Sequence, residues 1–164
     1  MIIRQALTET DVLNAFDIEQ TVYSSETAAS LEAFMMRKEN FSLYFLVAET
    51  SHRQIIGVTN SVKLQHIHLT DESIKQSTAS TLDGAYLCIL TIAVHPAHQR
   101  KGVASLLLQQ VIQLARRDLL KGIVLMCEEH LIEFYEKHGF VYISPSTSEH
   151  GGIKWHEMSL IWDV

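Results

Sequence analysis

Along the first 70 residues, short runs of apolar residues alternate with segments in which apolar residues recur every three or four positions. Each change of pattern indicates the start of a new secondary-structure element. Short apolar runs broken by polar turns predict strands, and apolar residues three or four apart, preceded by Ser, Thr or Asp, predict capped helices. Ser24 or Ser25 is the expected cap of the second helix, and Gly57 is expected to mark a bulge. The pattern predicts a strand over 1–7, helices over 8–23 and 24–39, and an antiparallel hairpin of 41–50 with 54–70.

The second half begins with the continuous apolar run 85–94, which is typical of a strand buried on both faces in the middle of a sheet. A basic turn and an amphipathic helix follow. The expected buried face of that helix consists of Val103, Leu106, Leu107, Val111, Ile112 and Leu114 or Ala115. Further along we expect a buried strand over 122–127, a short helix over 129–139 that ends at Gly139, and a closing pair of strands over 140–144 and 152–164. The polar segment 71–84 is expected to be an exposed loop near a site.

Length and composition agree with one α/β domain covering residues 1–164, since the chain is 47% hydrophobic and 20% charged and has two prolines. The net charge of −6 argues against nucleic-acid binding and suits a cationic substrate. The chain shows no signal pattern and no apolar run of about 20 residues, so we expect a cytoplasmic protein that makes no membrane contact. Cys88 and Cys127 lie in apolar runs and are expected to be reduced and buried.

The first candidate for a ligand-binding site is the basic turn between the buried strand and the amphipathic helix. From Gln99 to Ser105 this turn and the start of the helix read QRKGVAS. Gly102 lets the backbone approach a ligand closely, and Ala104 keeps the start of the helix free of bulk. The unpaired amides of a helix start, together with the helix dipole, favour a pyrophosphate. The turn lacks the Gly-Lys-Ser/Thr ending of a P-loop and the three glycines of a dinucleotide-binding fingerprint.

This turn matches the Q/R-x-x-G-x-G/A motif of the GNAT superfamily of acetyl-CoA-dependent N-acetyltransferases. The run ILTIAVHP before it resembles the central strand of that family, and HLIEFYEKHGF resembles its later helix, so the likeness covers about residues 85 to 143. It implies the GNAT fold, a mixed and mostly antiparallel sheet of about 6–7 strands, splayed in the middle, with helices on both faces. It also implies acetyl-CoA as co-substrate, bound by Ile92, Ala93 and Val94 of the strand and by Gln99, Arg100, Lys101, Gly102, Val103, Ala104 and Ser105 of the turn.

A narrower likeness points to the arylalkylamine (serotonin) N-acetyltransferase branch, through LTDESI, LTIAVHPAHQRKGVASLLL and VLMCEEHLIEFYEKHGF. Like that branch, the chain carries a glutamate, Glu128, where most of the superfamily has Asn. It departs from the branch at Cys88 and Leu90, which replace the histidines that carry protons away in those enzymes. The proton route is therefore expected to differ.

Two residues are carried over from the family as candidates for catalysis. Tyr135 occupies the position of the tyrosine beside the CoA sulfur, and its role would be to protonate the leaving thiolate; its alternative is a core aromatic that packs as Phe134 does. Glu19 corresponds to a glutamate that deprotonates the amine in some arylalkylamine acetyltransferases; its alternative is a solvated glutamate on a helix face. A primary ammonium has to lose a proton before it can attack a thioester.

Four histidines and Cys127 could also take part in chemistry, but none of them is assigned a catalytic role. His66 and His68 share one strand face and could relay a proton or line the substrate site, but without a Cys or carboxylate partner they make a poor zinc site, and no metal is expected. His95 and His98 are interpreted as loop structure that could touch CoA. The flanks of Cys127 raise a thiol pKa, which argues against a covalent acyl-cysteine.

These features predict direct acetyl transfer from acetyl-CoA to a primary amine of a small molecule, an arylalkylamine or a polyamine. The acceptor is expected beside the first two helices, the loop before the central strand and the loop 145–152. Two alternatives stay open: a protein or peptide N-acetyltransferase, and a non-catalytic acyl-CoA-binding sensor. A homodimer would also agree with the resemblance, since dimers are common in the superfamily.

Overall fold

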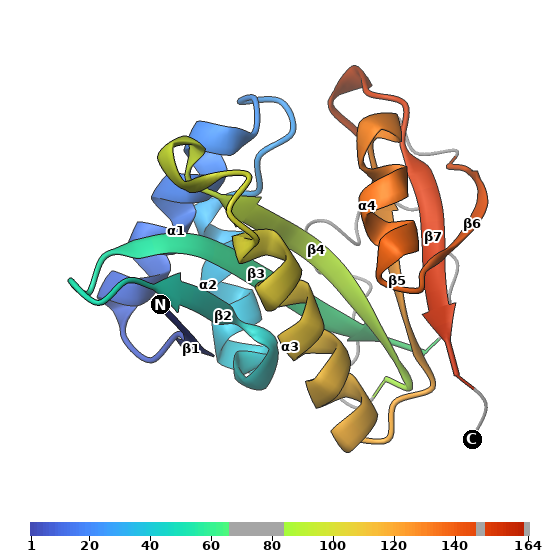
Figure 1. Ribbon diagram of the computed structural model, residues 1–164, viewed down its shortest axis with the longest axis horizontal. Coiled ribbons are helices and arrows are strands. Elements are labelled where there is room, and N and C mark those ends of the chain that lie inside the picture. Colours follow the sequence, from blue (N-terminus) through green and yellow to red (C-terminus); the bar gives the residue numbers. More distant parts are fainter. Residues whose placement is uncertain (66–83, 147–149, 163–164) are drawn as a thin grey trace.

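The computed structural model describes residues 1–65, 84–146 and 150–162, and its strands there form one mixed sheet of seven (Figure 1). The strand order is β1-β2-β3-β4-β5-β7-β6, and every neighbouring pair is antiparallel except β4 with β5. The strands are β1 (Ile2–Gln5), β2 (Leu46–Glu49), β3 (Ile55–Leu64), β4 (Tyr86–Val94), β5 (Gly122–Cys127), β6 (Val141–Pro145) and β7 (His156–Ile161). The expected mixed, mostly antiparallel sheet with β4 at its centre is confirmed.

Helices cover both faces of this sheet, as expected (Figure 1). One face carries α1 (Glu9–Val22) and α2 (Leu31–Asn40), and the other carries α3 (Val103–Arg117) and α4 (Ile132–Lys137). Short 3-10 turns lie at Ser42–Tyr44, Pro96–His98, Glu129–Leu131 and His150–Gly152. The expected exposed loop 71–84, the end of the expected hairpin, and His66 and His68 lie outside the described residues, apart from Gly84.

The starts of the two N-terminal helices differ in how well the sequence predicts them. The Thr8 side chain caps α1 by accepting the Asp11 amide at 3.0 Å. The expected cap of α2 at Ser24 or Ser25 is wrong, because the cap is Ser30, six residues after Ser24 and five after Ser25. The Ser24 carbonyl instead accepts the amides of Thr27 and Ala28 and closes a separate turn. Serine stabilises such turns as readily as helix starts, so its presence alone did not locate the cap.

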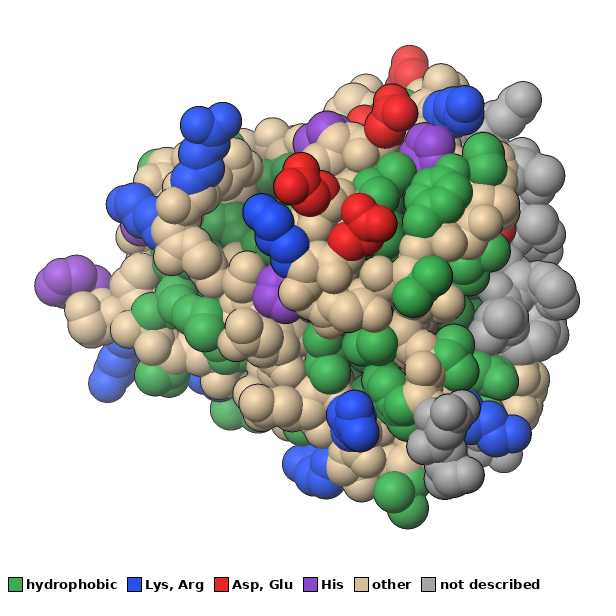
Figure 2. Space-filling model, turned by 45° about the vertical axis from the view of Figure 1, so that its right-hand side comes forward, with side chains coloured by type: hydrophobic (Ala, Val, Ile, Leu, Met, Phe, Trp, Pro, Cys, Tyr) green, Lys and Arg blue, Asp and Glu red, His purple; other side chains and the backbone are tan. Residues whose placement is uncertain are grey.

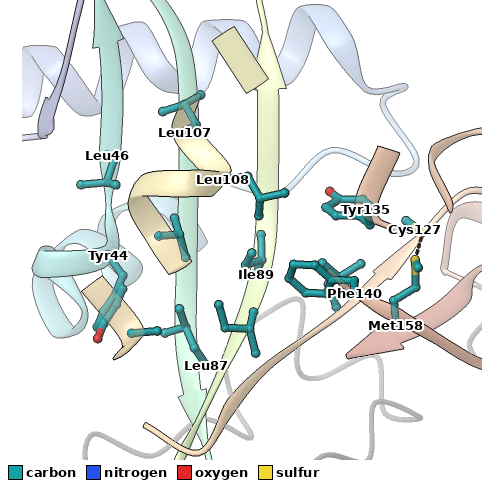
Figure 3. Close-up of a cluster of buried hydrophobic side chains, with 14 of the residues drawn as sticks. Tyr44, Leu46, Leu87, Ile89, Leu107, Leu108, Cys127, Tyr135, Phe140 and Met158 are labelled. Atoms are coloured by element: carbon teal, nitrogen blue, oxygen red, sulfur yellow. Dashed lines mark hydrogen bonds between the residues drawn. The ribbon is translucent and has the colours of Figure 1, made fainter. Parts of the chain in front are cut away.

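Alternating strand residues supply two cores on opposite faces of the sheet. On β2, Leu46 and Ala48 pack on the α3 side, and Val47 between them packs on the α1–α2 side. The α3 core continues across β4 and β5 to α4 and β7 (Figure 3). The expected buried face of α3 is confirmed at Val103, Leu107, Val111 and Ala115; Ile112 and Leu114 are partly buried. It is wrong at one position, because Leu106 is 43% exposed and Leu108 is fully buried.

The hydrogen-bonded stretch between the parallel strands β4 and β5 is shorter than either strand, and the remainder of β4, which does not pair with β5, contributes to the site. Pairing covers residues 86–89 with 122–125 and then stops. At this point β4 carries a bulge, since Asn60 of β3 pairs with Thr91 and Ser61 pairs with Ile89, which leaves Leu90 as the extra residue. Beyond the bulge the two strands diverge, and an opening separates β4 from the half of the sheet that contains β5 and β7 (Figure 1). The expected splay is confirmed.

The N-terminal end of α3 comes close to β3 at Gly57. A Cβ atom at Gly57 would lie 3.1 Å from Cγ1 of Val103 and 3.2 Å from Cδ1 of Leu107, so a larger residue would push the helix start away. Next to Gly57 the β2–β3 register shifts, since Ala48 pairs with Gly57 and Glu49 with Ile55. The bulge expected near this glycine is therefore present, at Ile56.

Candidate active site

The start of α3 is built to leave backbone amides open. Its N-cap, Gly102, has φ 83°, a left-handed conformation that glycine adopts without a steric penalty. The first amide of the helix to find a helical partner is that of Leu106, which donates to the Gly102 carbonyl at 3.1 Å. The amides of Val103, Ala104 and Ser105 therefore have no carbonyl partner within the helix. They lie at the positive end of a 15-residue helix dipole, where an anionic group is stabilised.

The turn before α3 is fastened to the end of β4. The Gln99 side-chain amide donates to the Val94 carbonyl at 3.0 Å, and the Ala97 amide donates to Nδ1 of His95 at 3.1 Å. These bonds hold the last residues of β4 at a set distance from the open amides. The interpretation of His95 as a loop-structuring residue agrees with this contact.

A cavity of about 670 Å³ joins the start of α3 to the diverging part of β4. Of the residues predicted to bind the co-substrate, its lining includes Ile92, Ala93, Val94, Gln99, Arg100, Gly102, Val103, Ala104 and Ser105. Lys101 is exposed and does not line it. The rest of the lining, which the sequence did not assign to co-substrate binding, consists of Val22 and Tyr23 at the end of α1 and of Glu128, His130, Leu131 and Phe134 after β5. His98 also lines this cavity, whereas His95 does not.

A second, narrower cavity of about 30 Å³ lies between β4 and β5. It is lined by Tyr23, Ile89, Leu90, Ile92, Leu125, Met126, Cys127, Glu128, Leu131, Tyr135 and Trp155. Tyr23, Ile92, Glu128 and Leu131 belong to both linings, so the two cavities share one wall. Leu90, one of the two residues that replace the expected histidines, lines the narrow cavity, whereas Cys88 is buried in a cluster with Phe41 and Val62.

Tyr135 is both a core aromatic and a lining residue of the narrow cavity. It is 4% exposed, and its ring lies edge-on to the rings of Phe134 and Phe140, with centroids 5.0 and 5.6 Å away. It projects from α4 toward β4, above the cluster with Phe140 and Met158 (Figure 3). Burial raises the pKa of Tyr135 well above its ordinary value, so the phenol keeps its proton at neutral pH. Among the described residues its hydroxyl has no hydrogen-bond partner and is free to donate.

Glu19 lies in a buried polar network behind this site. Its side chain is fully buried, which rules out the alternative of a solvated helix face. One carboxylate oxygen accepts the Ala29 amide at 2.7 Å, and the other accepts the Thr91 hydroxyl at 2.9 Å. Thr91 follows the bulge of β4, so the network holds that strand at the point where it leaves β5. Glu19 lines neither of the two cavities.

A buried arginine completes the network. Arg37 of α2 is fully buried, and its Nη1 lies 2.8 Å from Oδ1 of Asn60 and 3.3 Å from the Thr91 hydroxyl oxygen. Burial lowers the pKa of Arg37 to about 10, and the negative charge of Glu19 acts against that shift. Arg37 therefore stays protonated at neutral pH and balances the buried carboxylate.

Tyr23 connects the network to the cavities. Its amide donates to the Glu19 carbonyl at the end of α1, and its hydroxyl donates to the Ile92 carbonyl at 3.2 Å. Ile92 lies in the part of β4 that no longer pairs with β5. The tyrosine thus anchors the free stretch of β4 to α1. Burial, the largest cause, and the nearby charges of Glu19 and Glu128 raise the pKa of Tyr23 and keep it neutral.

Cys127 is placed beside Tyr135 but is unsuited to nucleophilic attack. Burial raises the pKa of its thiol to about 12, and the charge of Glu128 adds to the shift. The thiol points to the sulfur of Met158, 3.7 Å away. At neutral pH it is protonated, as the interpretation from the sequence expected.

Two further findings concern metal ligands and membrane-spanning helices. Among the described residues, no group of three or more His, Cys, Asp or Glu side chains could hold a metal ion. Within the same residues, every helix is too short or too polar to cross a membrane.

Comparison with known proteins agrees with this architecture. Residues 10–140 match the model of the acetyltransferase (GNAT) family. Serotonin N-acetyltransferase of Mesocricetus auratus is 26% identical over 161 residues, which span 94% of this chain and 74% of that protein.

Two solved structures share the fold over nearly the whole chain. The loading GNATL domain of CurA from Lyngbya majuscula is 13% identical, with a TM-score of 0.84 over 98% of this chain and 96% of that domain. The GphF GNAT-like decarboxylase, solved in complex with isobutyryl-CoA, is 17% identical, with a TM-score of 0.83 over 98% of this chain and 99% of that one. The family match covers most of the chain, and the chain has the same fold as these GNAT-like structures. The chain therefore belongs to the acetyltransferase (GNAT) family.

Proposed function

We propose that this chain transfers an acetyl group from acetyl-CoA directly to a primary amine of a small molecule, an arylalkylamine or a polyamine. The observation that carries the proposal is the divergence of β4 from β5, which joins the open amides of α3 to the cavity beside Tyr135. In this proposal residues 1–164 act as one catalytic domain. A cytoplasmic location and a homodimer stay predictions, and sedimentation of the purified protein would test the dimer.

The larger cavity fits an acyl-CoA in its chemistry. The amides of Val103, Ala104 and Ser105 and the side chain of Arg100 suit the pyrophosphate, and the stretch from Ile92 to Val94, which does not pair with β5, suits the amides of the pantetheine arm. Lys101, exposed beside this cavity, is proposed to meet an outer phosphate. When bound, acetyl-CoA supplies the activated acyl group. Every other function has to come from this chain.

Tyr135 is proposed as the proton donor to the departing thiolate. Its phenol is neutral, buried and free to donate, and it faces the cavity beyond the point where the strands diverge. A general acid in this position typically contributes about a hundred- to ten-thousandfold to the rate. The proton that the amine loses during attack can restore the phenol.

Glu19 stays our candidate for the base, but it cannot contact the amine directly. Since both carboxylate oxygens already accept hydrogen bonds and the side chain is fully buried, a proton could reach it only through the Thr91 hydroxyl. The same contacts would serve equally well to hold β4 in place. Measuring the pH dependence of the Glu19→Gln variant separates the two roles.

A cationic acceptor agrees with the surface charge. The chain has a net charge of −6, and acidic side chains gather on the upper part of the face shown in Figure 2. Glu129, Glu133 and Glu136 are exposed in or just before α4. Such a field raises the local concentration of a small cation.

The first experiment measures CoA release with a thiol reagent across tyramine, tryptamine, phenethylamine, spermidine, spermine and a lysine peptide. We expect saturable turnover with one class of small amine. Tyr135→Phe should then lower kcat about a hundredfold or more and leave acetyl-CoA affinity nearly unchanged.

The matched control is Tyr142→Phe, which removes a phenol hydroxyl that bonds Nδ1 of His156 at 2.9 Å, outside both cavities. It should keep most of the activity. Turnover confined to the lysine peptide would replace the small-amine proposal with protein acetylation. Acetyl-CoA binding without turnover on any acceptor would favour a sensor.

A further inference from the structure

We propose that Glu128 binds the ammonium group of the acceptor and makes the site selective for monocationic amines with an apolar tail. The proposal rests on the small-amine acetyltransferase function proposed above and narrows its substrate class. It assigns to Glu128 a binding role that is distinct from those of Tyr135 and Glu19.

The position of Glu128 is the first argument. It directly follows the last residue of β5 and belongs to the wall that the two cavities share. In the proposed function the acyl group lies where the cofactor cavity meets the cavity beside Tyr135, so an acceptor nitrogen has to reach this junction. Glu128 is the carboxylate found in both linings as far as the structure describes them.

The second argument is that the carboxylate of Glu128 is available. It is half-buried, and among the described residues it takes part in no side-chain hydrogen bond or ion pair. Glu19, by contrast, is fully buried and accepts two hydrogen bonds. A partly desolvated carboxylate without a partner is stabilised by a cation that arrives beside it.

The charge of Glu128 affects the pKa of titratable groups on both sides of the junction. It contributes to the raised pKa of Tyr23 on one wall and of the Cys127 thiol on the other. A negative charge that disfavours phenolate and thiolate favours an ammonium in the space between them. The electrostatics of the cavity thus agree with its geometry.

The other residues that line the narrow cavity favour an acceptor with a single positive charge. Apart from Glu128, the described wall of the narrow cavity is aliphatic, aromatic or sulfur-bearing, with Trp155 and Tyr23 as aromatic surfaces. Aromatic faces attract a cation, and a cavity of about 30 Å³ suits the ammonium end of the acceptor. A second ammonium, as in spermidine, would lie against apolar side chains without a counter-charge. One carboxylate in an apolar wall is therefore suited to a monoamine.

A pair of acceptors of nearly equal shape tests the charge requirement. Phenethylamine is cationic at neutral pH, whereas O-benzylhydroxylamine has the same length and a terminal amino group that is uncharged. Glu128→Gln should raise KM for phenethylamine about ten- to hundredfold and change KM for O-benzylhydroxylamine less than threefold. The matched control is Glu39→Gln, which removes the same charge from an exposed position on α2 outside both linings.

The outcomes separate the two proposals. If the unaltered chain acetylates no small amine, the proposed function fails. If it does, but Glu128→Gln changes KM for both acceptors equally or for neither, only the role of Glu128 fails. Higher kcat/KM for spermidine than for phenethylamine would overturn the monoamine preference. Circular dichroism and the thermal midpoint of each variant show that it is folded, and Glu128→Asp should restore part of the lost affinity.

Discussion

The two walls of the opening in the sheet are stabilised in different ways. The N-terminal wall, formed by α1, α2, β3 and β4, contains a fully buried polar network of Glu19, Thr91, Arg37 and Asn60. The C-terminal wall, formed by β5, α4 and β7, is apolar around Tyr135, Phe140, Cys127 and Met158 (Figure 3).

This difference corresponds to different tasks. The N-terminal wall offers backbone groups of a strand that has lost its partner, and hydrogen bonds from buried side chains hold that strand in position. The C-terminal wall offers side chains, Tyr135 and Glu128, on a rigid apolar base. Substitutions in the N-terminal wall and at the start of α3 should therefore affect acetyl-CoA binding and stability, and those in the C-terminal wall should affect turnover and acceptor binding.

The largest effect is expected from Gly102→Glu. The new carboxylate would be next to the phosphate-binding amides, and like charges placed together cost several kcal/mol, so acetyl-CoA should bind about a thousandfold more weakly. Gly102→Asn is the control, because asparagine tolerates the left-handed backbone and nothing lies within 4 Å of a Cβ at this position. Calorimetric titration with acetyl-CoA measures both. Equal affinities for the two variants would show that this end of α3 does not meet phosphate.

Glu19→Gln should have the next largest effect, this time on stability. It removes the negative charge that balances the buried Arg37, and leaving a buried charge uncompensated typically costs about 3 kcal/mol or more. Urea unfolding measures the loss, with Asp17→Asn on the exposed face of α1 as control.

The same Glu19→Gln variant also decides the catalytic role of this residue. If Glu19 is the base, the folded fraction should lose activity and the pH profile of kcat should change. If the profile per folded molecule is unaltered, Glu19 serves only to position β4.

The fold was largely predictable because its signals are local. The apolar run of β4, the glycine turn and the stripe of α3 each lie within about 20 residues, so periodicity and turn chemistry located them. The cap at Ser30 was missed because Ser24 and Ser25 offer the same local chemistry. The exposed Leu106 was misplaced because neighbouring leucines obscure the phase of the helix.

The site was less predictable because its contacts are distant in sequence. Glu19 and Thr91 are 72 residues apart, and nothing near Glu19 indicates that it is buried. Likewise Tyr23 and Trp155 reach the cavities through topology alone. The family resemblance located the start of α3 and Tyr135, and it noted Glu128 only as a departure from Asn. A carboxylate at the end of a buried strand was the available signal.

The third prediction concerns the apolar base of the C-terminal wall. Phe140 is 3% exposed, and its ring lies edge-on to that of Tyr135. Phe140→Leu should cost about 1.5 kcal/mol in free energy of unfolding and lower kcat several-fold while acetyl-CoA affinity stays constant. Val141→Ala, at a neighbour that is 64% exposed, is the control. Weakened acetyl-CoA binding in Phe140→Leu would contradict the division of tasks between the walls.

The smallest effect is expected at the far edge of the sheet, where β1 meets α1. Asp11 accepts two hydrogen bonds of 2.9 Å from Arg4 and forms a capping box with Thr8. The Arg4 guanidinium, the largest cause, together with the amides of Leu7 and Thr8, holds the pKa of Asp11 well below its ordinary value. A lowered folded-state pKa means that the stabilisation is complete above about pH 4 and is lost as the pH falls further.

Asp11→Asn should therefore cost about 1 kcal/mol at pH 7, and this difference from the unaltered chain should shrink steadily below pH 4. Urea unfolding at pH 7, 4 and 2.5 measures it, with the exposed Glu9→Gln in the same helical turn as control, expected to change stability by a few tenths of a kcal/mol. Because Asp11 is remote from both cavities, kcat and KM should stay unchanged. An altered KM would mean that the edge of the N-terminal wall also sets the position of β4, and that its influence extends beyond the buried network.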